Sequence, residues 1–125
     1  MANILFVDDD DVIRVHLGKV LESAGHTVSY ASDGQMGARL FDQGQFDLVI
    51  TDLEMPTSNG LRLIREVREI EPGIAVIAIS GKSPEHLLLA QDYGASRVLA
   101  KPTTPEQILD AVQGALSREV SLFRL

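Results

Sequence analysis

Three short apolar runs in this sequence each end in side chains that could do chemistry: Asp8 and Asp9 after the first, Asp52 after the second and Lys101 after the third. Adjacent carboxylates suit a hard divalent ion such as Mg²⁺, which takes one or two carboxylates together with phosphate oxygens and water. An aspartate can also act as a nucleophile toward phosphorus. A lysine that ends a buried strand should face these carboxylates, because an unpaired ammonium is costly to desolvate. The set therefore predicts a metal, a reactive aspartate and a lysine around one phosphoryl group.

A fourth apolar run ends in Ser80-Gly81, where the hydroxyl could bond a phosphate oxygen and the glycine leaves room for the group to approach. Each feature also has an ordinary structural interpretation. Asp10 or Asp11 could cap a helix, Asp52 could simply end a strand, and serine is common before a loop. The combination is more specific than its parts, because ligands bind at the carboxyl ends of the strands in an open α/β sheet.

The elements that must position these residues alternate between strand and helix patterns. Apolar runs predict strands at 3–8, 28–30, 47–51, 74–79 and 97–100. Helical spacing predicts helices at 12–24, from Met36 to near Gly44, and at 61–70, 84–93 and 105–118. Ser83-Pro84 and Thr104-Pro105 each place a capping hydroxyl before proline at the first helical position, and Gln107 completes a capping box. Buried strands separated by helices imply a parallel sheet, and right-handed crossovers make it a three-layer, doubly wound α/β domain.

Composition narrows the class of protein. A chain of 125 residues is long enough for one domain with a proper core, and its net charge of −7 argues against sequence-independent nucleic-acid binding. The absence of cysteine excludes disulfides, thiolate zinc sites and cysteine nucleophiles. No apolar run approaches the roughly 20 residues that span a bilayer, and no basic stretch precedes residue 4 as in a signal peptide. We expect a cytoplasmic protein with neither a membrane nor a nucleic-acid partner.

Over about residues 3–118 the sequence resembles the receiver domains of two-component response regulators, of the stand-alone type similar to the chemotaxis regulator. The resemblance rests on Ile4-Leu5-Phe6-Val7-Asp8-Asp9, Asp52-Leu53-Glu54-Met55-Pro56 with Gly60, Ser80-Gly81 and Lys101-Pro102. It implies a flavodoxin-like, five-stranded parallel sheet of strand order 2-1-3-4-5 with five helices. We expect a receiver domain over residues 1–118 and an apolar C-terminal tail over residues 119–125.

The resemblance also implies a role for each site residue. Asp52 would accept a phosphoryl group from a histidine kinase or a histidine phosphotransfer protein, Lys101 would pair with that group, and Ser80 would bond it in the active state. The implied ligands of Mg²⁺ or Mn²⁺ are Asp8, Asp9, Asp52 and the backbone carbonyl of Glu54. The protein would catalyse only its own phosphoryl acceptance and autodephosphorylation, and would not otherwise be an enzyme.

Departures from the family pattern concern switching and phosphoryl lifetime. Many receivers carry Tyr or Phe three positions before the lysine, where this chain has Val98, so switching must use Ser80 or loop and backbone shifts. Thr103 replaces the phenylalanine that often follows Lys-Pro. In this family Glu54 and Lys82 would flank the approach of water, and we expect them either to pair across the mouth and slow hydrolysis or to be two solvated charges.

Three successive leucines over residues 87–89 span about 200° of a helix, so the core cannot easily hide all of them. With Val98 nearby, the face of the fourth helix, fifth strand and fifth helix, which includes Leu88, is a candidate surface for an unidentified downstream protein or for a homodimer. The alternative is an ordinary exposed edge. His16, His26 and His86 are scattered, and we expect surface or packing roles for them.

Two other functions are considered. A pseudo-receiver would bind partners without being phosphorylated. A haloacid-dehalogenase-type phosphatase would use Asp8 and Asp10, but it needs an acidic pair on a strand after Lys101, where the acidic residues fall in the last helix region. The phosphatase interpretation also leaves Asp52-x-x-Met-Pro unexplained.

Overall fold

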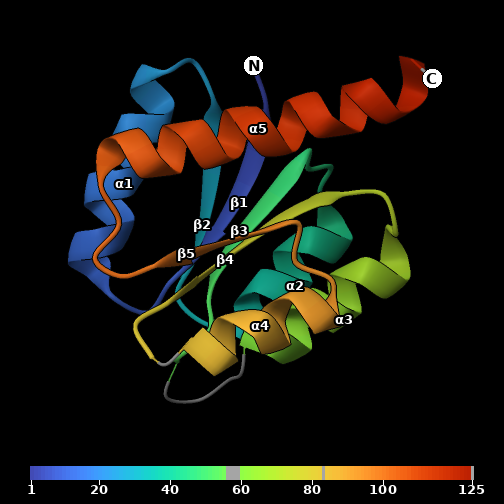
Figure 1. Cartoon of the computed structure of the whole chain (residues 1–125). Coiled ribbons are helices and arrows are strands. Elements are labelled where there is room, and N and C mark those ends of the chain that lie inside the picture. Colours follow the sequence, from blue (N-terminus) through green and yellow to red (C-terminus); the bar gives the residue numbers. More distant parts are fainter. Residues whose placement is uncertain (56–59, 83, 125) are drawn as a thin grey trace.

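The computed structural model describes residues 1–55, 60–82 and 84–124, with side chains described through residue 117 of the last helix. One sheet of five parallel strands runs through the molecule in the order β2-β1-β3-β4-β5 (Figure 1), as the resemblance implied. The strands are β1 (Asn3–Val7), β2 (Thr27–Ala31), β3 (Leu48–Asp52), β4 (Ala75–Ser80) and β5 (Arg97–Ala100). The helices are α1 (Asp11–Ser23), α2 (Gly34–Gln43), α3 (Gly60–Ile70), α4 (Pro84–Tyr93) and α5 (Pro105–Arg124).

The helices form two layers that cover the two faces of the sheet (Figure 1). Leu17 of α1 and Ile108 of α5 belong to one buried cluster, while Ile64 of α3 and Ala90 of α4 belong to the other. The central strands β3 and β4 are buried along their whole length, because helices pack on both of their faces. The predicted three-layer, doubly wound fold is confirmed.

The strand register brings the site residues to one edge of the sheet. Val7 lies opposite Thr51, and Asp52 lies opposite Ile79, so the residues that follow β1 and β3 leave the sheet beside the end of β4. Ser80 lies opposite Ala100, which places Lys101 one residue beyond. Four sequence-distant segments therefore end at the same edge.

Side-chain caps fix where the helices begin at this edge. The Oδ1 atom of Asp10 accepts hydrogen bonds from the amides of Val12 and Ile13, at 2.9 and 3.2 Å, so Asp10 rather than Asp11 is the N-cap of α1. At the start of α5, Thr104 and Gln107 exchange bonds of 2.9 and 3.1 Å as a capping box. Ser83, the predicted cap of α4, lies outside the described residues.

The largest difference from the predicted elements is at the end of α5. This helix continues to Arg124 instead of ending at residue 118, so most of the segment predicted as a tail extends the helix. The functional boundary between a receiver domain and this segment stays a prediction. In the part of the chain that is described, no helix combines the length and apolar character that crossing a membrane requires.

Candidate functional site

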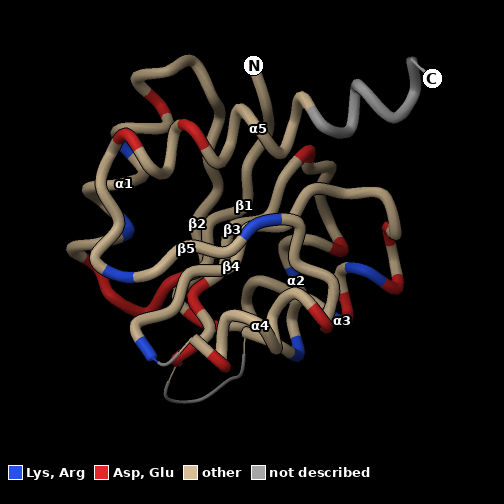
Figure 2. The backbone as a smooth tube through the Cα atoms, viewed as in Figure 1, with Lys and Arg blue, Asp and Glu red and all other residues tan. Residues whose placement is uncertain are grey.

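Three carboxylates come together where β1 and β3 end. Asp8, Asp9 and Asp52 each offer an oxygen, and these oxygens all lie within 4.8 Å of one another. Asp8 and Asp52 are buried, whereas Asp9 is exposed. Figure 2 shows the acidic stretch after β1 at the same edge as the acidic end of β3. This is the cluster that the sequence predicted.

The state of Asp8 tests whether a cation fits this cluster. Its Oδ1 accepts the amide of Asp10 at 2.9 Å, but its buried Oδ2 has no hydrogen-bond partner within the described part of the chain. Burial raises the pKa of Asp8 from 3.8 to about 6, although the hydrogen bond from Asp10 opposes the rise. A buried carboxylate oxygen without a partner is costly, and a divalent cation would relieve that cost. The residues present therefore fit a magnesium-type ion.

Asp52 is held on both of its carboxylate oxygens. Oδ2 lies 3.0 Å from the ammonium of Lys101, and Oδ1 accepts the amide of Glu54 at 3.1 Å. Only 1% of the Asp52 side chain is exposed, against 25% for Lys101. Burial raises the pKa of Asp52, while the bonds from Lys101 and Glu54 counteract it. The prediction that the lysine faces the carboxylates is confirmed.

Lys101 stays cationic despite its partial burial. Burial lowers its pKa, but the hydrogen bond and charge of Asp52 outweigh that effect, so the pKa of Lys101 lies above its usual value. The peptide bond that joins it to Pro102 is cis. Because its pKa is raised, Lys101 carries a positive charge beside the Asp52 carboxylate, the candidate nucleophile.

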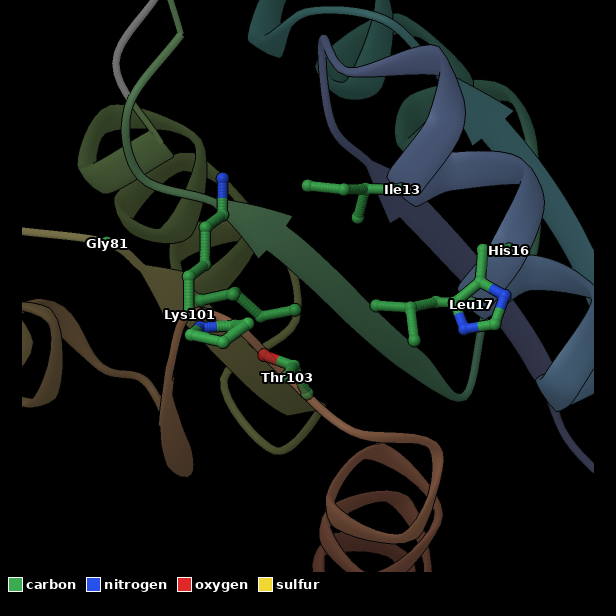
Figure 3. A pocket seen from close by; sticks show the side chains of 8 residues that line it. Ile13, His16, Leu17, Gly81, Lys101 and Thr103 are labelled. Atoms are coloured by element: carbon green, nitrogen blue, oxygen red, sulfur yellow. The ribbon is translucent and has the colours of Figure 1, made fainter.

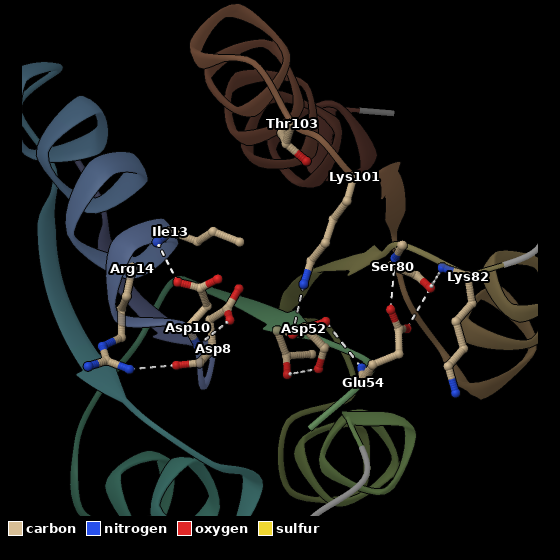
Figure 4. Close-up of polar contacts among 12 residues, drawn as sticks. Asp8, Asp10, Ile13, Arg14, Asp52, Glu54, Ser80, Lys82, Lys101 and Thr103 are labelled. Atoms are coloured by element: carbon tan, nitrogen blue, oxygen red, sulfur yellow. Dashed lines mark hydrogen bonds and ion pairs between the residues drawn. The ribbon is translucent and has the colours of Figure 1, made fainter. Parts of the chain in front are cut away.

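The side chain of Glu54 points toward the end of β4 (Figure 4). Ser80 Oγ donates to Glu54 Oε2 at 2.5 Å, and the amide of Gly81 donates to Oε1 at 2.7 Å. His86 Nδ1, on α4, lies 3.0 Å from Glu54 Oε2 and 3.2 Å from Ser80 Oγ. Burial raises the pKa of Glu54, but the bonds from Ser80 and Gly81 lower it below its usual value.

The predicted pairing of Glu54 with Lys82 is not formed. Within the described residues no ion pair joins the two side chains. The backbone amide of Lys82 instead donates a hydrogen bond of 3.1 Å to Ser80 Oγ. Glu54 bonds Ser80 and Gly81 instead, because these donors lie directly beside it at the strand end. A role of Glu54 and Lys82 in phosphoryl lifetime stays a prediction.

Two residues near the site escaped sequence reasoning. His86 was expected in a surface or packing role, yet it contacts both Glu54 and Ser80. Arg14 donates from Nη1 to the backbone carbonyl of Asp8 at 2.7 Å and also pairs with Asp11, which holds the loop after β1. The spacing of Asp11 and Arg14 was a detectable signal for a helical pair. The contact of His86 depends on how α4 crosses the sheet, and no local spacing reveals that.

Gly60, the first residue of α3, packs closely against the backbone of Asp52 and Leu53. A Cβ atom built on Gly60 would lie 2.2 Å from the backbone oxygen of Asp52 and 2.8 Å from the Cα of Leu53. The start of α3 therefore packs directly against the backbone of the candidate nucleophile, and any side chain at Gly60 would displace it.

A cavity of about 330 Å³ opens beside Lys101, between α1 and the loop before α5 (Figure 3). Ile13 and Leu17 line it from α1, and Thr103 lines it from the loop. Val12, on the same helix, is 76% exposed, and Val15 is 53% exposed. On the other side of the site, Leu88 of α4 is 61% exposed, while Val98 is partly buried and packs on the core.

Known proteins are similar to this chain over most of its length. A family model described as the response regulator receiver domain matches residues 4–113. Protein CcdB of Bacillus subtilis is 31% identical over 114 residues, which cover 90% of this chain and 95% of that protein. The transcriptional regulatory protein GlrR of Escherichia coli strain K12 is 34% identical over 119 residues, which cover 94% of this chain. The chain spans only 27% of the length of GlrR.

A solved structure agrees over nearly the whole molecule. The response regulator receiver domain protein from Clostridium thermocellum superposes with a TM-score of 0.90 at 34% identity. The match covers 98% of this chain and 99% of that one.

Proposed function

Since this chain belongs to the response regulator receiver family, we propose that it accepts a phosphoryl group on Asp52 and signals through phosphorylation-dependent binding or a phosphorelay. The observation that carries the proposal is the buried Asp52 carboxylate, 3.0 Å from the Lys101 ammonium and within the acidic cluster of Asp8 and Asp9. Phosphoryl transfer is mostly positioning and charge stabilisation, so this small set suffices.

The reaction moves one phosphoryl group from a donor to the carboxylate. An oxygen of Asp52 forms a bond to phosphorus while the bond between phosphorus and the donor histidine nitrogen breaks. Lys101, whose ammonium lies 3.0 Å from Asp52 Oδ2, would neutralise charge on the transferred group. Mg²⁺ or Mn²⁺, held by Asp8, Asp9, Asp52 and the carbonyl of Glu54, would shield the phosphoryl oxygens from the carboxylates. Hydrolysis of the resulting acyl phosphate would reset the protein, with no other substrate turned over.

Two surfaces suit the partners of a cytoplasmic receiver. A histidine kinase or histidine phosphotransfer protein must reach Asp52 through the mouth of the site, and we propose that it contacts α1 at Val12 and Val15, which are exposed. A downstream protein, or a second copy of the chain, would bind the face that contains Leu88. Neither surface requires nucleic acid or a membrane.

The direct test is the intact mass of the protein after incubation with acetyl phosphate and Mg²⁺. Wild type should gain one phosphoryl group only when the metal is present, and Asp52→Ala should gain none. Asp110→Ala, which removes an exposed carboxylate of α5, should behave like wild type. No gain in wild type would favour a pseudo-receiver. Catalytic release of phosphate that depends on Asp8 and not on Asp52 would favour a phosphatase.

The geometry gives little support to the phosphatase. That mechanism needs Asp10 as an acid-base partner of Asp8, but the Oδ1 atom of Asp10 is engaged in capping α1. Lys101 contacts Asp52, which the phosphatase would not use.

A further inference from the structure

The carboxylate of Glu54 occupies an anion-binding position at the end of β4. One carboxylate oxygen accepts a hydrogen bond from the hydroxyl of Ser80, and the other accepts one from the backbone amide of Gly81. A hydroxyl and a backbone amide at a strand end are the donors that phosphate oxygens also use. Glu54 therefore fills the position of an anion with its own side chain.

These donors lie next to the candidate phosphoacceptor. Ser80 follows Ile79, which lies opposite Asp52 in the sheet. A Cβ built on Gly81 would lie 3.5 Å from the side chain of Lys101 and 3.8 Å from Glu54 Oε1. Because Lys101 bonds Asp52, Gly81 borders the space into which a group on Asp52 would extend.

His86 holds the Glu54 carboxylate in place. Its Nδ1 lies 3.0 Å from Glu54 Oε2, an ion-pair distance for a protonated imidazole, and the charge of His86 lowers the pKa of Glu54. The same nitrogen lies 3.2 Å from Ser80 Oγ. Both Glu54 and His86 are largely shielded from water, with 21% of each side chain exposed.

We infer that Glu54, positioned by His86, acts as an internal competitor that holds Ser80 and Gly81 away from the phosphoryl group until phosphorylation displaces it. The inference rests on the proposed phosphorylation of Asp52. Ser80 has one hydroxyl proton, so it cannot donate to Glu54 and to a phosphoryl oxygen at the same time. Glu54 and His86 are positioning residues in this scheme, since they act through Ser80 and Gly81.

The test measures binding of beryllofluoride, a stable phosphoryl mimic, in the presence of Mg²⁺. Removing a charge-assisted competitor should lower the half-saturating concentration of beryllofluoride about tenfold in Glu54→Ala. His86→Ala should shift it in the same direction by a smaller factor. His86→Asn, which keeps an N–H donor near the position of Nδ1, should stay close to wild type, as should the control Glu66→Ala on α3.

A spectroscopic signature separates this role from a merely structural one. In the absence of beryllofluoride, the Gly81 amide proton should resonate at lower field in wild type, where it donates to the Glu54 carboxylate, than in Glu54→Ala, which lacks that acceptor. Glu54→Gln keeps the size of the side chain and removes its charge, so it should show intermediate binding if Glu54→Ala does not fold.

The outcomes distinguish the two proposals. Beryllofluoride binding by wild type with equal or weaker binding by the folded Glu54 variants overturns the competitor alone. The absence of binding that depends on Asp52 in wild type overturns the proposed function, and the competitor with it.

Discussion

At the scale of single residues, Asp8 is a side chain whose burial costs folding stability although its carboxylate suits the proposed metal site. Its side chain is buried, one of its oxygens lacks a partner among the described residues, and its pKa is raised to about 6, chiefly by burial. A position that stabilises the fold would not carry this charge. A divalent cation held by the cluster, as proposed above, would relieve this cost.

This burial predicts a pH dependence of stability in the metal-free protein. Because the folded pKa of Asp8 lies above its unfolded value of 3.8, its contribution to stability is complete below pH 3.8. That contribution is lost as pH rises through about 6, and the change corresponds to roughly 3 kcal/mol. Asp8→Asn should therefore be more stable than wild type at pH 7 with chelator present.

Urea denaturation from pH 5 to pH 7.5, with and without Mg²⁺, checks the prediction. The advantage of Asp8→Asn should grow with pH in chelator. Mg²⁺ should stabilise wild type more than Asp8→Asn. Parallel pH curves for the two proteins in chelator would contradict the account.

A second prediction at this scale concerns the phosphorylated form. Once a phosphoryl group takes Ser80 and Gly81, the Glu54 carboxylate is released and can pair with Lys82 across the mouth of the site. Removing either charge should shorten the phosphoryl half-life by roughly twofold to fivefold, since exposed pairs are weak. The test is the half-life of the phosphorylated protein for wild type, Glu54→Ala, Lys82→Ala and the control Glu66→Ala. Unchanged half-lives in the Glu54 and Lys82 variants would contradict the pairing.

At the scale of elements, the sequence predicted most of what positions the site. Strand ends bearing Asp52, Ser80 and Lys101 were recognisable because buried parallel strands read as continuous apolar runs. The capping pattern at Thr104 located the start of α5, whereas helical spacing predicted α1 and left Asp10 and Asp11 as alternative caps. The contact of His86 with Glu54 was not predictable, because it depends on the angle and height at which α4 packs on the sheet.

The packing of α3 against β3 gives a prediction for Gly60. A methyl group there would meet the backbone oxygen of Asp52, so Gly60→Ala must shift the strand end or the helix. We expect a loss of stability of about 1–3 kcal/mol, as for other overpacked sites. Weaker Mg²⁺ binding should accompany it. Thermal unfolding and metal titration test this, with Gly73→Ala as a control because a Cβ there meets nothing within 4 Å. Equal metal affinity in both variants would contradict the link to Asp52.

At the scale of the whole molecule, the site lies between two exposed apolar surfaces. Val12 and Val15 of α1 lie on one side, and Leu88 and Leu89 of α4 lie on the other. In an acidic chain of net charge −7, such surfaces offer contacts that do not depend on a basic partner. Under the proposed function, each surface would bind a different protein.

Separate surfaces predict separable effects. Val12→Asp should reduce phosphoryl transfer from a protein donor by tenfold or more, through a charge buried in the contact, and leave phosphorylation by acetyl phosphate unchanged. Leu88→Asp should leave both reactions unchanged and weaken downstream binding or self-association. Transfer assays with the two donors, together with sedimentation of the phosphorylated protein, provide the measurements. Equal loss with both donors in Val12→Asp would point to damage at the site itself.

The order of the strands has a consequence for when the protein becomes able to react. Asp52, the proposed phosphoacceptor, is on β3, but the ammonium that pairs with it is on the segment after β5, 49 residues later in the chain. During synthesis the first four strands can emerge while the reaction centre still lacks its cation. Under the proposed function, a growing chain would therefore lack the cation beside its phosphoacceptor until the last strand joins the sheet.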